Sequence, residues 1–200
     1  MEVYIFGDQT ADCRSFLTKV FRHKGSLLQD NFLAQASRAI REEISAREHG
    51  VNNIPEFGTV QELADRYYTQ DVADPAIEST LVCISQLAHF IGYFEDQPQK
   101  YPSFSKDVRL VGLCTGLLSA AAVAASNSLV ELVPRAIETV RIAFKTGSLV
   151  ATTAERFGGD VGKDSWSSIV VSDFTSAQKA IDRFHNDKVC YIWSCLYGTT

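Results

Sequence analysis

Apolar residues recur along this chain with two different spacings. A continuous apolar run at residues 3–6, and the apolar residues around Arg109 at 108–111, are each followed by glycine, which predicts two short buried β-strands. An apolar stripe at every fourth position begins near Ser26 and predicts a long amphipathic helix. A second helix is predicted after Asp74-Pro75, because Asp caps helices well and Pro suits the first helical position. The two stripes are Leu28, Phe32, Ala36, Ile40 and Ile44, then Ile77, Leu81, Ile84, Ala88 and Ile91.

Capping boxes mark two further helix starts. In each box a Thr or Ser is followed three residues later by Glu, so the two side chains can satisfy backbone N–H groups of the first turn. Thr59 with Glu62 predicts one such helix. Ser128 with Glu131 predicts another, which Gly147 ends or kinks. We find no internal repeat and no linker long or polar enough to separate two domains.

The order strand, helices, strand, tight turn, helix is typical of an α/β fold with parallel strand pairing. In such folds the ligand binds beyond the carboxyl ends of the strands. Two sharp turns, at residues 7–9 and 112–116, directly follow the predicted strands. We therefore expect both turns at the same edge of the sheet, where they would form a site together.

Composition narrows the range of partners. Lys and Arg number 19 against 24 for Asp and Glu, a net charge of −5, so nucleic acid is not an expected partner. Five cysteines, an odd number without paired spacing, indicate free thiols and a reducing compartment such as the cytoplasm. Their positions do not match metal-ligand spacing, so we expect no metal site.

One uncharged run tests whether the chain enters a membrane. Residues 110–130 carry no charge and are numerous enough to span a bilayer. Seven of these 21 residues are Gly, Ser, Thr or Asn, which transfer poorly to lipid but pack well in a protein core. We expect a buried strand followed by a buried helix, and no membrane partner. The first eight residues also lack the basic leader and apolar stretch of a signal peptide.

Residues 112–116 read Gly-Leu-Cys-Thr-Gly, between a predicted strand and a predicted helix. This is the context of a nucleophile elbow, with Cys114 in place of the usual Ser. The tight turn strains the backbone of the nucleophile, and flanking glycines avoid collisions with the neighbouring strand and helix. The thiol would stand at a helix N-terminus, where the dipole favours a thiolate. The backbone N–H of Thr115 can then point at the oxyanion of an acyl intermediate.

The turn after the first predicted strand offers a second oxyanion donor. It reads Phe-Gly-Asp-Gln-Thr at residues 6–10, and the backbone N–H of Gln9 is the candidate. The residues alone leave two simpler interpretations open. Asp8 is also typical of an ordinary strand-end turn, and Cys114 is also consistent with a small buried residue in a glycine-rich core turn.

Together these features resemble the starter-unit acyl-carrier-protein transacylase domain that opens fungal non-reducing polyketide synthases. The resemblance extends over nearly all of the chain up to about residue 187. Its most specific part is the pairing of Phe-Gly-Asp-Gln-Thr with Gly-x-Cys-x-Gly. The segments that carry it are residues 6–10, 81–83, 86–87, 101–102, 110–118, 129–134 and 166–170.

The resemblance implies both a fold and a reaction. The fold is the N-terminal part of a malonyl-transacylase-like α/β fold. In it, an α/β-hydrolase-like large subdomain with a short parallel sheet flanked by helices carries an inserted ferredoxin-like subdomain. The reaction moves an acyl group from acyl-CoA or an acyl carrier to Cys114 and then to the phosphopantetheine of an acyl carrier protein. Gln9 and Thr115 would be the oxyanion donors. No cofactor would stay bound, since the substrates arrive on CoA and phosphopantetheine.

The chain also departs from the family's pattern. The family's catalytic His lies beyond residue 200, after the small subdomain. After residue 187 the sequence becomes aromatic and Cys-rich where that subdomain should begin. We therefore expect a transacylase domain at 1–187 that lacks most of the small subdomain, and a divergent tail at 188–200. The histidines present, none in the matching context, are His23, His49, His89 and His185.

Two alternatives to an active transacylase stay open. One is a truncated, non-catalytic remnant of such a domain, whose uncovered apolar surface favours self-association. The other is a Cys-nucleophile α/β hydrolase, which needs an acid and a His after the elbow in chain order. His185 is the only histidine after Cys114, so the hydrolase ranks last.

Overall fold

The structure is a computed structural model of the 200-residue chain. It divides into two compact units, residues 1–163 and 164–200, and the described residues all lie in the first. The domain boundary predicted between residues 187 and 188 therefore lies outside the described part and stays a prediction. The described residues are 2–7, 13–22, 26–46, 54, 56–69, 74–101 and 108–156.

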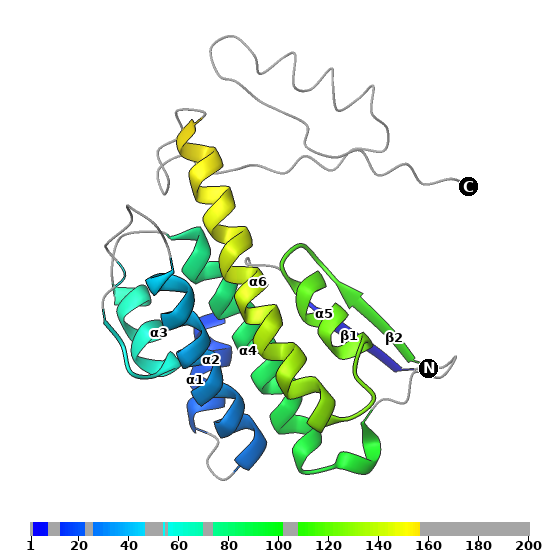
Figure 1. Ribbon diagram of the computed structural model, residues 1–200. Coiled ribbons are helices and arrows are strands. Elements are labelled where there is room, and N and C mark those ends of the chain that lie inside the picture. Colours follow the sequence, from blue (N-terminus) through cyan, green and yellow to red (C-terminus); the bar gives the residue numbers. More distant parts are fainter. Residues whose placement is uncertain are drawn as a thin grey trace, which may run out of the picture. The chain divides into compact units, whose positions relative to one another are not determined.

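This part of the chain is mostly helical, with one short parallel sheet of two strands, and has the predicted α/β class (Figure 1). The strands pair in register, with Glu2 opposite Val108 and Phe6 opposite Gly112. Both strands consequently end at the same edge of the sheet, as expected. The elements are β1 (Glu2–Phe6), α1 (Cys13–Arg22), α2 (Leu27–Ser45), α3 (Val60–Thr69), α4 (Pro75–Glu95), the 3₁₀ helix η1 (Pro98–Lys100), β2 (Val108–Gly112), α5 (Gly116–Ala124) and α6 (Leu129–Arg156).

Both predicted capping boxes are present, but in each the Glu side chain accepts from a different backbone N–H than the motif predicts. The Thr59 hydroxyl accepts from the backbone N–H of Glu62 at 3.1 Å, as the motif predicts. The Glu62 carboxylate, however, accepts from the N–H of Gly58, one residue before the cap, at 2.8 Å. The box that opens α6 follows the same pattern. These contacts satisfy donors that a helix start otherwise leaves unpaired.

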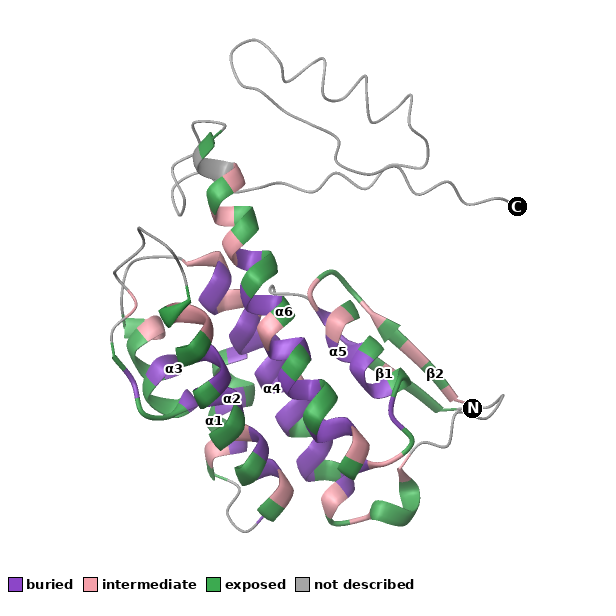
Figure 2. Cartoon of the chain, in the orientation of Figure 1, coloured by how far each residue is buried: buried purple, intermediate pink, exposed green. Residues whose placement is uncertain are grey.

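Helix α4 lies at the centre of the described part and is buried on nearly every face (Figure 2). It begins at Asp74, whose carboxylate accepts from the N–H groups of Ala76 and Ile77, as predicted for a capping Asp. It packs along α6 in the most extensive helix pair, and also contacts α1, α2 and α5 (Figure 1). Its apolar stripe from Ile77 to Ile91 is fully buried, as the spacing predicts.

Aromatic side chains join the sheet to α4. Tyr4 and Phe6 of β1 pack against Phe90, each with a ring-centroid distance of 5.9 Å. Phe90 in turn stacks on Phe94 at 4.7 Å. Such pairs contribute about 0.5–1.5 kcal/mol each beyond the area that they bury. They fix β1 against the C-terminal part of α4.

The prediction that both strands are buried is wrong. In β1 only Phe6 is buried, while Val3 and Ile5 are 47% and 67% exposed. In β2 the side chain of Val111 is 40% exposed. Successive side chains of a strand point to opposite faces, and in the described part the helices cover only one face of this sheet (Figure 2). In β1 a continuous apolar run does not distinguish one covered face from two, and in β2 the exposed Arg109 interrupts the apolar run.

The prediction that the helix ends at Gly147 is also wrong, whereas the alternative of a kink there stays a prediction. Helix α6 continues through Gly147 to Arg156. A Cβ atom at Gly147 would lie 2.3 Å from the carbonyl oxygen of Pro75, at the start of α4. The glycine therefore serves close packing of α6 on α4, not helix termination.

The uncharged run at residues 110–130 is divided among β2, the turn after it, α5 and the first residues of α6. This is the strand followed by a helix that the sequence predicts, with buried residues on α5 including Ala120 and Val123. Among the helices that the structure describes, none is long and apolar enough to cross a membrane.

Candidate active site

Cys114 lies in the turn between β2 and α5, at the carboxyl edge of the sheet. Its thiol is exposed, and its backbone φ is 50°, the left-handed region. It is the one residue other than glycine with positive φ among those described. This conformation costs a residue with a side chain about 1–3 kcal/mol, and such strained residues cluster at active sites and ligand-binding turns. It is the strained geometry predicted for a nucleophile elbow.

The two glycines beside Cys114 are required by close packing. A Cβ atom at Gly112 would lie 2.4 Å from the Cα of Leu117. A Cβ atom at Gly116 would lie 2.3 Å from the carbonyl oxygens of both Phe6 and Gly7. These are the collisions with helix and strand that the Gly-x-Cys-x-Gly pattern predicts. They also bring the turn after β1 directly against the elbow.

Three backbone hydrogen bonds close the elbow. The N–H of Leu113 donates to the carbonyl of Phe6 at 2.9 Å, which ties the elbow to the end of β1. The N–H groups of Gly116 and Leu117 donate to the carbonyls of Leu113 and Cys114 at 2.8 and 3.0 Å, which starts α5. Cys114 therefore stands at the N-terminal end of α5, where the helix dipole favours negative charge.

Helix α4 contacts both turns with one face. The side-chain amide nitrogen of Gln86 donates to the carbonyl of Gly7 at 2.6 Å. The thiol of Cys83 donates to the carbonyl of Thr115 at 3.8 Å. Cys83 and Gln86 are three residues apart and so share a helix face. Sequence reasoning gave neither residue a role, although their helical spacing within a segment of family resemblance was a usable signal.

The described cysteines have different environments. Cys13 and Cys83 are buried, whereas Cys114 is exposed. Burial raises the pKa of the Cys83 thiol to about 12, so Cys83 stays protonated and unreactive at neutral pH. Among the cysteines that the structure describes, only Cys114 joins exposure to a helix start.

The sequence around this elbow matches a known family over almost its full length. The model of the SAT family, described as "Starter unit:ACP transacylase in aflatoxin biosynthesis", matches residues 4–197. The chain belongs to the SAT family. The match includes the last three residues of β1 and all of α4, the elbow and α6. It also runs through most of the tail at 188–200, which was predicted to diverge from the family.

Relatives of this SAT chain include fungal polyketide synthases. Non-reducing polyketide synthase 1 of Elsinoe fawcettii is 41% identical over 190 residues, which are 92% of this chain and 8% of the relative. Non-reducing polyketide synthase Preu8 of Preussia isomera is 40% identical over 192 residues, 94% of this chain and 9% of the relative. Conidial pigment polyketide synthase PfmaE of Pestalotiopsis fici is 38% identical over 189 residues, which are 92% of this chain and 9% of the relative. The SAT chain thus spans less than a tenth of the length of these relatives.

The predicted SAT site residues are only partly described. Thr115 follows Cys114 immediately, with its hydroxyl oxygen 4.0 Å from the Cys114 sulfur. Gln9 lies outside the described residues, so its predicted role stays a prediction. His89 is the one histidine that the structure describes. It is exposed on α4, and its ring lies 6.1 Å from that of Phe16 on α1.

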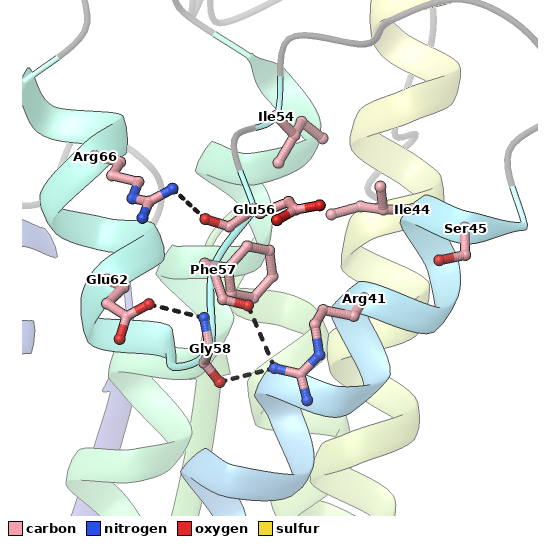
Figure 3. A pocket seen from close by; sticks show the side chains of 9 residues that line it. All are labelled: Arg41, Ile44, Ser45, Ile54, Glu56, Phe57, Gly58, Glu62 and Arg66. Atoms are coloured by element: carbon pink, nitrogen blue, oxygen red, sulfur yellow. Dashed lines mark hydrogen bonds between the residues drawn. The ribbon is translucent and has the colours of Figure 1, made fainter.

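Away from the elbow, a hollow of about 650 Å³ lies between α2 and α3 (Figure 3). The guanidinium of Arg41 donates to the carbonyls of Phe57 and Gly58, the latter at 2.7 Å. Arg66 donates to the carbonyl of Glu56. Both arginines thus hold the segment that leads into α3. We assign this hollow a structural role, because the guanidinium groups of both arginines donate to backbone carbonyls.

Proposed function

We propose that this chain acts as a starter-unit acyl-carrier-protein transacylase domain in which Cys114 carries the acyl group as a thioester. The observation behind the proposal is the exposed thiol of Cys114, held at φ 50° between two glycines that cannot be replaced without collision. Membership of the SAT family supports acyl transfer to a carrier protein as the reaction class.

The reaction consists of two thioester exchanges. First, the Cys114 thiolate attacks the carbonyl carbon of an acyl thioester on CoA or a carrier. A carbon–sulfur bond forms, the bond to the donor sulfur breaks, and the departing thiolate takes up a proton. Second, the phosphopantetheine thiol of an acyl carrier protein loses its proton and attacks the acyl-Cys114 thioester, which releases the Cys114 thiolate. Each step replaces one thioester by another, so the proposal requires no resident cofactor.

Each attack places negative charge on the former carbonyl oxygen. We assign its stabilisation to the backbone N–H groups of Thr115 and Gln9. Two observations support this. Thr115 is the first residue after the nucleophile at the start of α5, and Gly7, two residues before Gln9, lies against Gly116 in the elbow. Loss of one such donor typically costs about 10²–10³ in rate.

The proposal includes a fold and a setting. Parallel β1 and β2, with the elbow directly after β2, support the elbow-bearing part of a malonyl-transacylase-like fold. The described cysteines, Cys13, Cys83 and Cys114, are thiols, which supports a reducing setting such as the cytoplasm, where CoA and carrier thioesters are also found.

The test is acyl labelling of the purified chain. Acetyl-, butyryl- and hexanoyl-CoA are each added, and intact mass followed by peptide mapping locates the acyl group. We expect one acyl group on Cys114. Cys114→Ala should abolish labelling. Cys83→Ala removes the buried thiol on α4 that donates to the carbonyl of Thr115 in the elbow, and this variant should retain labelling. Acyl groups found on Cys83 or Cys190, or retained in Cys114→Ala, would refute the assignment.

A further inference from the structure

The last two carbonyl groups at the exit of β1 are held by different parts of the fold. The carbonyl of Phe6 accepts from the N–H of Leu113 in the elbow at 2.9 Å. The carbonyl of Gly7 accepts from the side-chain amide of Gln86 on α4 at 2.6 Å. Because a peptide unit is planar, holding its carbonyl orients the whole unit. Two hydrogen bonds therefore set the direction in which the chain leaves β1.

The same exit has no room to move toward the elbow. The Cα of Gly116 packs so closely on the carbonyls of Phe6 and Gly7 that even a methyl group does not fit. Gln86 holds the Gly7 carbonyl from α4, while Gly116 limits it from α5. The position of Gly7 relative to Cys114 is thus determined by contacts with two helices.

The side chain of Gln86 is placed in a way that surface packing does not explain. Its amide oxygen is buried and has no hydrogen-bond partner among the residues that the structure describes. A buried, unpaired amide oxygen costs about 1–3 kcal/mol. An apolar residue of similar size would avoid this cost but would not bind the Gly7 carbonyl. The hydrogen bond to Gly7 is therefore the feature that distinguishes Gln86 from a simple packing residue.

We propose that Gln86 is a positioning residue for acyl transfer, which holds the exit of β1 so that the following turn presents its oxyanion donor to the Cys114 thioester. This inference rests on the proposed function. An oxyanion donor acts at about 2.7–3.1 Å from the developing charge. A displacement of about 1 Å can cost on the order of 10²-fold in rate. Gln86 acts on the reaction only through Gly7 and the turn after it.

The test compares two reactions of the same thiol. Acylation by acyl-CoA passes through an oxyanion, whereas alkylation by iodoacetamide is a direct displacement at carbon and forms none. Gln86→Met keeps the side-chain length but removes both hydrogen-bonding groups, and Gln86→Glu removes the donor. Ser85→Ala is the matched control, since it removes a buried hydroxyl on the same turn of α4 that, within the described part of the chain, bonds only to the carbonyl of Val82.

We expect both Gln86 variants to lower the single-turnover acylation rate of Cys114 by about tenfold or more, within the range for loss of oxyanion stabilisation. Their alkylation rates should stay within about twofold of wild type, because the elbow itself is intact. Ser85→Ala should change neither rate. Unchanged acylation in Gln86→Met would overturn the proposal. A parallel fall of both rates would also overturn it, because that result indicates general loss of the elbow.

A second measurement separates this inference from the proposed function. If wild-type Cys114 is not acylated, the proposed function fails, and hydrogen exchange at the amide of Leu113 then tests Gln86. That amide donates to Phe6, next to the Gly7 carbonyl that Gln86 holds. Faster exchange in Gln86→Met than in Ser85→Ala supports positioning of the β1 exit by Gln86. Equal exchange in the two variants overturns it.

Discussion

The carboxylate of Glu95, at the last residue of α4, accepts a hydrogen bond of 2.9 Å from the backbone N–H of Leu28, at the start of α2. It also accepts from the N–H of Gln29 at 3.2 Å and from the hydroxyl of Ser26. Ser26 itself makes no side-chain cap to α2. The first turn of α2 is therefore capped by a carboxylate 67 residues further along the chain.

These contacts give the stability of the fold a specific pH dependence. Burial raises the pKa of Glu95, but the hydrogen bonds from Ser26, Leu28 and Gln29 outweigh it and hold the pKa below its usual value. A carboxyl group with a lowered folded pKa stabilises the fold above its unfolded pKa, about 4.3 for Glu. That contribution is lost as the pH falls through the folded pKa.

We therefore expect Glu95→Gln to be less stable than wild type at pH 7, with a difference that shrinks below about pH 4. Urea unfolding of both proteins between pH 7 and pH 3 measures the difference in unfolding free energy. Glu138→Gln, which removes an exposed carboxylate on α6, is the control and should change stability little. A Glu95→Gln difference that is constant over the whole range would contradict this account.

The elbow predicts a contrast between two glycine substitutions. Gly116→Ala places a methyl group 2.3 Å from two backbone carbonyl oxygens, so α5 must move away from β1. We expect a loss of about 1–3 kcal/mol in unfolding free energy, as for overpacking elsewhere, together with loss of Cys114 acylation. At Gly58 the nearest atom to an added Cβ is a carboxylate oxygen of Glu62 at 3.5 Å, an ordinary contact.

Gly58→Ala is therefore the matched control and should stay within about 0.5 kcal/mol of wild type. Urea unfolding and single-turnover acylation are measured on both variants. Equal stability of Gly116→Ala and Gly58→Ala would show that α5 can shift freely, and the case for a rigid elbow would fail.

Much of this architecture follows from local patterns in the sequence. The Asp74 cap, the stripe along α4 and the Gly-x-Cys-x-Gly turn each depend on residues close together in the chain. The structure contains the helix that Asp74 caps, the parallel strands and the strained backbone of Cys114 that these patterns predict. Contacts between distant residues left no such local pattern. The cap of α2 by Glu95 and the bond from Gln86 to Gly7 depend on how helices pack, so they were not predicted.

Gly147 shows how this limit produced a wrong prediction. A glycine within a helix is locally unfavourable by about 1 kcal/mol relative to Ala, which favours a helix end at that position. Packing on the backbone of Pro75 outweighs that preference, because α4 and α6 approach too closely for any side chain. A local propensity was overridden by a tertiary contact.

We expect Gly147→Ala to destabilise the fold by about 1–3 kcal/mol despite the gain in helix propensity, since the added methyl group meets backbone atoms that cannot rotate away. Thr146→Ala, at the exposed neighbouring position of α6, should be neutral within about 0.5 kcal/mol. Thermal and urea unfolding of the two variants measure both effects. If Gly147→Ala were the more stable of the two, the propensity argument would hold and the packing argument would fail.

The last prediction concerns turnover. In the proposed reaction, acylation of Cys114 needs only the thiolate and the oxyanion donors, but transfer to a carrier protein also needs a base that removes the proton from the phosphopantetheine thiol. By resemblance to the family, this base would be a histidine beyond residue 200. His89, the one described histidine, packs against Phe16. Loss of a general base typically costs about 10²–10⁴-fold.

We therefore expect the 200-residue chain, assayed alone, to accept an acyl group on Cys114 yet pass it on slowly. The same chain extended by a complete family C-terminal half should transfer it about 10²–10⁴-fold faster, because the extension supplies the base. The measurement is the rate of acyl-carrier-protein loading from acyl-CoA, with Cys114→Ala as the blank for both forms. Equal loading rates would contradict the expectation. They would mean that a residue already present acts as the base, and His185, the only histidine after the nucleophile, would be the first to replace by Ala.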